Sequence, residues 1–284
     1  MSLAFIGGTG IYRMEGVEDL EELRVDTPFG PPSDLIKRTR VGGREVFFLP
    51  RHGAGHRLLP SEIPARANIW ALKKLGVTRV IGVSAVGSLK EDIRPRDIVI
   101  PSQVIDRTRS RPSTFFGDGV VGHVSFADPF CPDLAGLLYD CVQELDYRVH
   151  RGETYVCMEG PAFSTRAEST LYRSWGGGVI GMTALPEAKL AREAELCYAV
   201  MATSTDYDCW KEEEEAVTVD MIVQNIQANT RAAHAVLARV IQRVPETADC
   251  GCGEAARHAI LTDPSRIPRE VRERLRPLYG KYWD

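Results

Sequence analysis

Two aspartates, Asp206 and Asp208, directly follow the most apolar run of the chain, residues 197–205. A carboxylate can accept hydrogen bonds from an amino group, and one whose pKa is raised can protonate a ring nitrogen. The alternative interpretation is a loop with an N-cap aspartate. Because the apolar run is expected to be a buried strand, and because other polar segments also follow strands, we favour a functional site at this strand end.

Four more polar segments follow predicted strands, and each could bind an anion. They comprise a glycine-rich turn at 7–10, a basic loop at 51–53, a serine segment at 84–88 and a helix start at 181–187. Backbone N–H groups, hydroxyls, arginine and helix N-termini are all phosphate donors. Each segment alone is equally compatible with a turn, an exposed loop or a helix cap. Their candidate residues are Thr9, Arg51, His52, Ser84 and Thr183.

Several well-known motifs are absent from these segments. Arg13 stands where the dinucleotide fingerprint counted from Gly8 requires glycine, and no Walker lysine follows. His52 and His56 have the spacing of a helical zinc pair, but glycines lie between them and the acidic partner is missing. Ser84 is not in a G-x-S-x-G elbow. We therefore expect neither a dinucleotide, nor a metal, nor a serine nucleophile.

The segment 159–168 is expected to open a helix. Thr165 and Glu168 have the spacing of a capping box, although Ser164 could also cap the helix. Phe163 precedes it. A phenylalanine is more often a core residue, but at a strand exit it could stack on a flat heterocycle.

Apolar runs and amphipathic stretches alternate along the chain and would position these residues. Strands are predicted at 3–6, 45–49, 79–84, 97–101, 154–158, 178–182 and 197–205, and helices at 64–75, 134–145, 166–175, 187–195 and 219–244. This alternation predicts an α/β fold with a mostly parallel or mixed central sheet surrounded by helices. We expect one domain over residues 1–244 and a C-terminal helical appendage over 245–284, with short helices at 254–262 and 269–279.

Composition excludes several other classes of protein. The 284 residues carry a net charge of −4, which argues against nucleic acid as the main partner. The N-terminus has only a short apolar run and no basic segment, and no stretch approaches the length of a membrane span. We expect a cytoplasmic enzyme that has no membrane partner.

Cys250 and Cys252 are the only two of the seven cysteines with a suggestive spacing. They could form a strained disulfide, half of a metal site or two unrelated thiols. A zinc site would need two further ligands, and His258 is the only obvious nearby one. Free thiols are our default expectation for a reducing compartment.

Several long motifs, in this order, resemble the methylthioadenosine phosphorylases, which are trimeric nucleoside phosphorylases. They include IGGTGIY, FLPRHGAGHRLLPSEIPARANIWALKKLG, SAVGSL, DIVIPSQVIDRT, EGPAFSTRAE, GMTALPEAKLAREAELCYA and TDYDCWKEEEEAVTV. The resemblance covers about residues 3–244. It implies the single-domain nucleoside phosphorylase fold and phosphorolysis of S-methyl-5′-thioadenosine to adenine and 5-methylthioribose 1-phosphate. Inorganic phosphate is then a co-substrate, with no metal or organic cofactor. The implied assembly is a homotrimer or a dimer of trimers.

The resemblance also implies roles for single residues. Phosphate would be bound by Thr9, Arg51, His52, Ser84, Ala85 and Thr183. Phe163 would flank the purine, Met182 would lie by the ribose, and Ile222 and Val223 would line the methylthio pocket, to which a neighbouring subunit offers His123. Ser164 and Val219 match positions associated with substrate choice. Asp206 and Asp208 would recognise adenine through N6 and N7, with Asp208 as the catalytic acid and Asp206 assisting it.

Three rival functions remain open at this point. One is a purine nucleoside phosphorylase acting on inosine, guanosine or adenosine. The second is a hydrolytic nucleosidase, against which the Arg51–His52 loop argues because that reaction uses water. The third is a non-catalytic nucleotide-binding protein, which would be expected to carry the dinucleotide fingerprint that this chain lacks.

Overall fold

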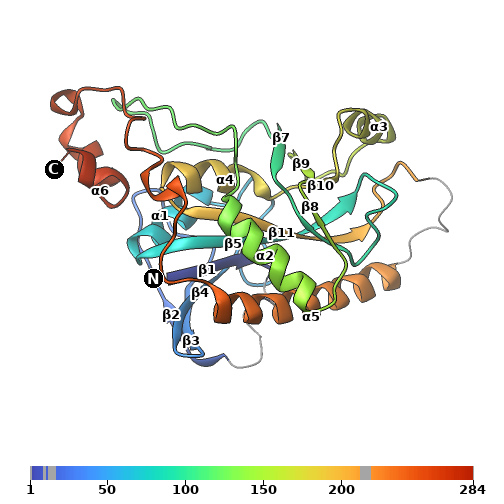
Figure 1. Ribbon diagram of the computed structural model, residues 1–284. Helices are drawn as coiled ribbons and strands as arrows, with labels where there is room; N and C mark the ends of the chain where they lie inside the picture. Colours follow the sequence, from blue (N-terminus) through green and yellow to red (C-terminus); the bar gives the residue numbers. More distant parts are fainter. Residues whose placement is uncertain (1, 9–10, 12–16, 212–218, 284) are drawn as a thin grey trace.

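A mixed β-sheet forms the centre of the molecule (Figure 1). The computed structural model describes residues 2–8, 11, 17–211 and 219–283, with only the backbone described for 18–19 and 219–223. Its strands follow the order β2-β3-β4-β1-β5-β10-β9-β7, and β11 joins β5 to β6, which pairs with β8. The strands are β1 Ser2–Gly7, β2 Glu18–Leu23, β3 Ile36–Val41, β4 Arg44–Pro50, β5 Val77–Ser88, β6 Ile98–Ile100, β7 Gln103–Arg107, β8 Val149–Arg151, β9 Thr154–Met158, β10 Val179–Gly181 and β11 Cys197–Asp206.

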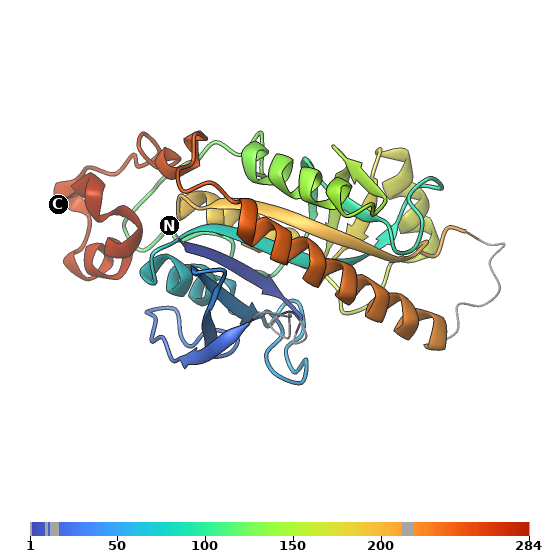
Figure 2. The same cartoon turned by 60° about the horizontal axis from the view of Figure 1, so that its bottom comes forward.

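Helices cover both faces of this sheet, as the sequence predicts (Figure 2). Helices α2 (Pro132–Glu144) and α5 (Val219–Arg243) pack against each other and against β11 on one face. Helices α1 (Ala65–Lys74) and α4 (Ala184–Glu193) pack together on the other face. Helix α3 (Arg166–Ser174) lies at the end of the molecule opposite α6 (Arg269–Trp283).

The alternation of side chains along the strands divides the core in two. Leu3 and Phe5 of β1 pack in the core under α2 and α5, whereas Ala4 and Ile6 pack in the core under α1 and α4. Successive side chains of a strand point to opposite faces, so a strand covered on both sides must be apolar throughout. This is why residues 3–6 of β1, 80–83 of β5 and 197–202 of β11 read as apolar runs.

Strand β5 changes its partner along one edge, and this change opens the sheet. Strand β1 pairs with it in parallel as far as Gly82, and the antiparallel strand β10 pairs with it only from Gly87. Between these points, among the strands that the structure describes, β5 is paired only on its other edge, with β11. Ligands of open α/β sheets bind at such changes of strand order.

The sequence patterns miss the outer hairpin of β2 and β3. The two strands carry the charged sequences EDLEEL and IKRTRV, which lack the usual composition of strands. Their charges are complementary across the pair: Arg38 contacts Glu21 and Lys37 contacts Glu22, both at 2.5 Å. Stabilisation by cross-strand ion pairs becomes visible only once the pairing is known.

The chain from residue 245 onward packs along α1 and against the start of β5, where Arg79 contacts Pro245. Trp70 Nε1 in α1 donates a hydrogen bond of 3.1 Å to the carbonyl of Arg274 in α6. The expected helix at 254–262 is wrong, since a 3₁₀ turn at Gly251–Glu254 is followed by further turns. The segment is instead held by single contacts, such as Ala256 N–H to Glu195 Oε1 at 3.1 Å. These tertiary contacts override its local helix propensity.

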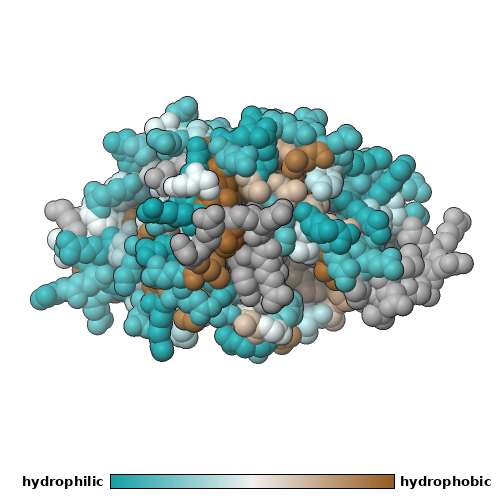
Figure 3. Space-filling model, turned by 90° about the horizontal axis from the view of Figure 1, so that it is seen from below, coloured by the Kyte–Doolittle hydropathy of each residue, from teal (hydrophilic) through white to brown (hydrophobic). Residues whose placement is uncertain are grey.

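No helix in the described part of the chain is long and apolar enough to cross a membrane. The face seen in Figure 3 is mostly hydrophilic, and apolar side chains gather in a strip near its middle.

Candidate active site

The strand ends bring most of the candidate residues into one region. Strands β1, β4, β5 and β11 run in parallel, so their carboxyl ends meet at one edge. Strand β10 runs antiparallel to β5 and therefore returns Thr183 towards Ser84. The change of partner along β5 lies between these groups.

Arg51 is buried at the centre of this region and is held by four hydrogen bonds. Its Nε donates to Glu187 Oε1 at 2.5 Å, and Nη2 donates to Glu187 Oε2 at 3.1 Å. Nη2 also donates to the carbonyl of Ile6 at 3.0 Å, and Nη1 donates to that of Val83 at 2.7 Å. Arginine has five N–H groups, so among the described residues one N–H on Nη1 remains to meet an anion.

Glu187 fixes both the position and the charge of Arg51. Burial by itself lowers the pKa of Arg51, but the Glu187 carboxylate outweighs it, and the pKa lies above its usual value. Tyr198 Oη donates to Glu187 Oε2 at 2.9 Å and fills the space beside Gly82. A Cβ at Gly82 would stand 2.4 Å from that hydroxyl, so glycine is required there. The sequence patterns suggest a role for neither Glu187 nor Tyr198.

His52 follows Arg51 and is oriented by two contacts. Its Nδ1 lies 2.8 Å from the carbonyl of Leu58, and its ring stacks on His56 at 4.1 Å. Burial lowers the pKa of His52, so the ring is neutral at pH 7 and its Nδ1–H donates to Leu58. The remaining Nε2 can accept a hydrogen bond from a protonated phosphate oxygen.

Three hydroxyls form a chain where β10 approaches β5. Thr183 Oγ1 donates to Ser84 Oγ at 3.0 Å, and Ser84 Oγ lies 3.0 Å from Tyr155 Oη. Burial raises the pKa of Tyr155 to about 12, so its hydroxyl keeps its proton. Thr183 is the N-cap residue of α4, but its side chain makes no capping bond. Leu185 in the first turn of α4 is non-helical and its N–H donates to Cys157 Sγ at 3.4 Å, so the donors at this point are the hydroxyls, whose hydrogens can rotate towards an anion. Ala85 is exposed beside them.

The two aspartates lie together over Gly87 of β5. A Cβ at Gly87 would stand 3.1 Å from Asp206 Oδ1 and 3.3 Å from Asp208 Cβ, so the absence of a side chain admits both. Thr205 Oγ1 donates to Asp206 Oδ2 at 2.6 Å. Burial raises the pKa of Asp208. Its Oδ2 is buried and has no hydrogen-bond partner among the residues that the structure describes. The Ser169 hydroxyl and the Cys209 N–H act against this rise in the pKa, and burial outweighs them. A carboxyl group whose pKa is raised can hold a proton for transfer to a ligand.

Helix α5 fixes the strand end that carries these aspartates. Asn225 Nδ2 donates to the carbonyl of Thr205, and Asn229 Nδ2 donates to that of Ser204, both at 2.9 Å. The Ser204 carbonyl also accepts from Arg96 N–H at 2.8 Å, so the amides of α5 add to the backbone bonds at this end of β11.

Arg111 is a second buried arginine that sequence reasoning missed. Its Nη1 donates to the carbonyls of Met182 at 2.5 Å and Leu185 at 2.7 Å, and its Nη2 donates to those of Met158 and Glu159. Its Nε lies 3.4 Å from Glu159 Oε2. Arg111 therefore ties the exit of β9 to that of β10 and places Met182.

Ser164 and Phe163 lie on the loop before α3. The predicted capping box is present: Thr165 accepts from Glu168 N–H, and Glu168 accepts from Thr165 N–H. Ser164 is buried, and its carbonyl accepts from Cys209 Sγ at 3.3 Å, next to Asp208. Phe163 is 83% exposed, so its ring is open to a ligand or to another chain.

The remaining candidates are not joined to this site by the structure. Thr9 lies outside the described residues, and Val219, Ile222 and Val223 lie in α5 where only the backbone is described. His123 is exposed, and its N–H donates to the carbonyl of Ala259 at 2.9 Å. That C-terminal segment lies at the other end of the sheet from α3 (Figure 1).

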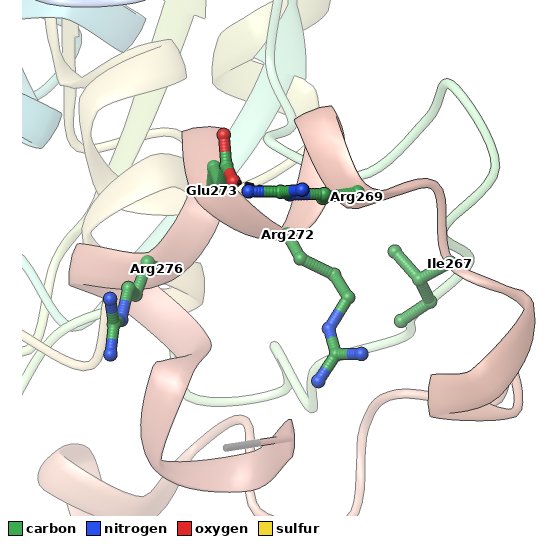
Figure 4. A pocket seen from close by; sticks show the side chains of 5 residues that line it. All are labelled: Ile267, Arg269, Arg272, Glu273 and Arg276. Atoms are coloured by element: carbon green, nitrogen blue, oxygen red, sulfur yellow. Dashed lines mark hydrogen bonds and ion pairs between the residues drawn. The ribbon is translucent and has the colours of Figure 1, made fainter.

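A shallow hollow of about 410 Å³ lies on the C-terminal segment, away from these residues (Figure 4). Arg269 in its wall pairs with Glu273 at 2.9 Å, and Arg272 donates to the carbonyl of Trp283. These arginines hold the segment itself, and we assign no ligand to the hollow.

Comparison with known proteins shows the family of the chain. The model of the phosphorylase superfamily matches residues 2–242. The S-methyl-5′-thioadenosine phosphorylase of Geobacter sulfurreducens is 55% identical over 281 residues, covering 99% of this chain and 98% of that protein. A methylthioadenosine phosphorylase from an Antarctic soil metagenomic library superposes with a TM-score of 0.92 at 46% identity, covering 97% of this chain and 98% of the other.

A third similar structure contains a ligand. It is a mutant adenosine/methylthioadenosine phosphorylase from Schistosoma mansoni in complex with methylthioadenosine, with a TM-score of 0.83 and 34% identity. The match covers 90% of this chain and 96% of that one. The chain therefore belongs to the phosphorylase superfamily and, within it, to the family of S-methyl-5′-thioadenosine phosphorylases.

The buried ion pair leads to a prediction about stability. Glu187→Gln leaves the Arg51 guanidinium buried without its counter-charge, and we expect the free energy of unfolding to fall by about 3–5 kcal/mol. Urea unfolding followed by circular dichroism measures this change. The control is Glu254→Gln in the exposed pair with Arg257, which should cost less than about 1 kcal/mol. Equal losses in the two variants would contradict the central role of Glu187.

Proposed function

We propose that this chain catalyses the phosphorolysis of S-methyl-5′-thioadenosine, releasing adenine and 5-methylthioribose 1-phosphate. One observation carries the proposal. An arginine with an N–H remaining, a hydroxyl chain and a buried carboxyl group gather where β5 changes partners. An anion and a purine that meet at one centre need this combination. The family to which the chain belongs performs this transfer.

Phosphate is the nucleophile in this reaction. It attacks C1′ as the bond to adenine breaks, and positive charge develops on the sugar. The remaining Nη1–H of Arg51 and the hydroxyls of Ser84 and Thr183 would place the phosphate before the reaction. His52 Nε2 would accept a hydrogen bond from a protonated phosphate oxygen, and Ala85 and Thr9 would complete the phosphate site. The phosphate charge then also stabilises the sugar cation.

Adenine leaves as a neutral base when N7 is protonated. Asp208 is our candidate acid, because burial raises its pKa and its Oδ2 has no partner among the described residues. Asp206 lies beside it over Gly87 and would accept from the N6 amino group. An ionised carboxylate repels the O6 of a 6-oxopurine. This pair therefore favours adenine over the bases of inosine and guanosine.

The rest of the nucleoside would be bound by side chains around this centre. Phe163 would flank the purine, Met182 would lie by the ribose, and Ile222 and Val223 would line the methylthio pocket. Ser164 and Val219 would influence substrate choice. No metal or organic cofactor takes part in this chemistry.

We further propose that the site is completed in a homotrimer or a dimer of trimers. His123 does not join the site within its own chain, and Phe163 is 83% exposed. A second copy could bring His123 to the methylthio pocket and cover exposed apolar side chains. We place the enzyme in the cytoplasm, since its seven cysteines are spread over a long chain and lack the dense spacing of a disulfide-rich secreted protein.

Base release is the experiment that tests the function. Methylthioadenosine, adenosine and inosine are each incubated with the protein, with and without phosphate, and the free base is measured by chromatography. We expect adenine from methylthioadenosine only when phosphate is present. Release without phosphate would identify a nucleosidase, and faster release from inosine would identify a 6-oxopurine phosphorylase.

Asp208→Asn should lower kcat by about 10²–10⁴, because an amide cannot protonate N7. The KM for phosphate should change little, because Asp208 lies on the purine side. Steady-state kinetics with methylthioadenosine measure both values. Asp92→Asn, at an exposed aspartate, is the matched control. An unchanged kcat in Asp208→Asn would refute the assignment of the acid.

The same variant should change stability in a pH-dependent way. The pKa of Asp208 in the folded chain is raised above its ordinary 3.8, so folding is opposed as pH rises from that value through the folded pKa. Asparagine carries no charge to bury. We therefore expect Asp208→Asn to be more stable than the parent at about pH 7, with the difference shrinking towards about pH 4. Thermal unfolding at both pH values tests this, and a variant that is less stable at neutral pH contradicts it.

A further inference from the structure

Four cysteines from distant parts of the chain converge at one point. The Sγ atoms of Cys131, Cys197, Cys250 and Cys252 all lie within 4.8 Å of one another. Cys197 and Cys250 are 3.2 Å apart. Cys131, Cys197 and Cys252 are buried, and Cys250 is partly buried. The other three cysteines, Cys141, Cys157 and Cys209, lie outside the cluster.

Rigid elements of the core supply half of this cluster. Cys131 is the N-cap residue of α2, and its side chain makes no capping bond there. Cys197 is the first residue of β11. Cys131 N–H donates a hydrogen bond of 2.8 Å to the carbonyl of Tyr198, the residue after Cys197. This bond keeps the two cysteines close to each other. These two thiols are the further ligands that the sequence could not provide for a Cys250–Cys252 site. His258, the candidate suggested by the sequence, is exposed and is not in the cluster.

We propose that Cys131, Cys197, Cys250 and Cys252 bind one Zn²⁺ ion as a tetrathiolate site. Zinc in structural sites is tetrahedral with Zn–S bonds of about 2.3 Å, which places the sulfurs about 3.8 Å apart. The observed spread of up to 4.8 Å needs only small movements to reach that geometry. On binding, zinc loses its waters, four Zn–S bonds form and each thiol releases its proton to solvent. No electron is transferred.

Zinc fits this donor set better than the other common ions. Four sulfur ligands exclude magnesium and calcium, which prefer oxygen, and a tetrahedral S₄ set is typical of zinc or iron. All four positions are protein ligands, so no position is left for water, as in structural sites. A cleft of about 670 Å³, lined by Phe130, Pro132, Cys250 and Cys252, gives the ion a route to the cluster.

The site would fasten the C-terminal segment to the core. Cys250 and Cys252 belong to that segment, and Cys131 and Cys197 belong to the core. Other contacts also hold this segment: Arg79 donates to the carbonyls of Pro245 and Thr247 at 2.8 and 2.6 Å, and Ala256 is buried in the core. Strand β11 separates Cys197 from Asp206 by its full length of about 30 Å, given a rise of about 3.3 Å per residue. The zinc is therefore structural and takes no part in base release.

Metal analysis of the purified full chain tests this inference. The protein is expressed with zinc in the medium and dialysed without chelator. Elemental analysis should find one zinc per chain. After zinc removal and denaturation without reductant, a thiol reagent should count seven thiols. Cobalt added to the metal-free chain should give the intense visible absorption of tetrahedral cobalt thiolate. Chelation should lower Tm, while the rate of base release per folded chain stays unchanged.

Two variants test whether zinc binding depends on this cluster and not on the other cysteines. Cys252→Ser should raise the Kd for zinc by at least about 100-fold, because loss of a ligand costs at least as much as loss of an outer-shell contact. Cys141→Ser removes another buried thiol in α2 and should keep one zinc per chain.

Several results would overturn the zinc site. Three reactive thiols instead of seven, with no zinc, would show two disulfides. Seven thiols that take up neither zinc nor cobalt would show a plain thiol cluster. Iron in place of zinc, or zinc retained by Cys252→Ser, would also contradict the assignment. None of these outcomes bears on the base-release experiment, so this inference and the proposed function fail separately.

Discussion

The ion pair between Arg51 and Glu187 holds the active-site end of the molecule together. A guanidinium that is only 2% exposed must be both neutralised and fully hydrogen-bonded. Glu187 supplies the charge from α4, and the carbonyls of Ile6 near the end of β1 and Val83 in the middle of β5 supply acceptors. Tyr198 adds β11 to the same network. The residue that would bind phosphate is thus also the residue that fixes four elements relative to one another.

The sheet leaves room for a ligand because β5 is longer than its partner. Where β1 ends, β5 continues, and β10 returns along the same edge in the opposite direction. Hydroxyls therefore gather at the gap, while β11 on the other edge carries the aspartates forward. Burial has different consequences for the charges of Arg51 and Asp208. At Arg51 the Glu187 carboxylate outweighs the effect of burial and keeps the guanidinium charged, whereas at Asp208 burial raises the pKa of the carboxyl group. A cation for phosphate and a proton for the base thus come from one fold.

The far end of the sheet is organised by different chemistry. Glu195 is buried beside the C-terminal segment and pairs with Lys281 at 2.7 Å, and it also accepts from Ala256 N–H. The four-cysteine cluster lies near these contacts, at the start of β11. After residue 245, apolar side chains such as Ile267, Leu275 and Trp283 pack into the core under α1 and α4, and polar contacts such as that of Ala256 N–H to Glu195 hold the turns at 251–259. This explains why local helix propensity wrongly predicts a helix at 254–262.

The sequence by itself determined much of this protein. Apolar runs located the strands of the core, strand exits located the polar groups, and Thr165 with Glu168 located the start of α3, because these signals are local in the chain. The tertiary structure alone decided which distant groups meet. Glu187 beside Arg51, Tyr155 beside Ser84, Arg111 under the carbonyls of two loops and Cys131 beside Cys252 have no local pattern. The hairpin of β2 and β3 was missed for the same reason: its charges are unfavourable in each strand alone and become favourable only when the strands pair. Periodicity reports which residues are buried, and only the packed chain reports what they are buried against.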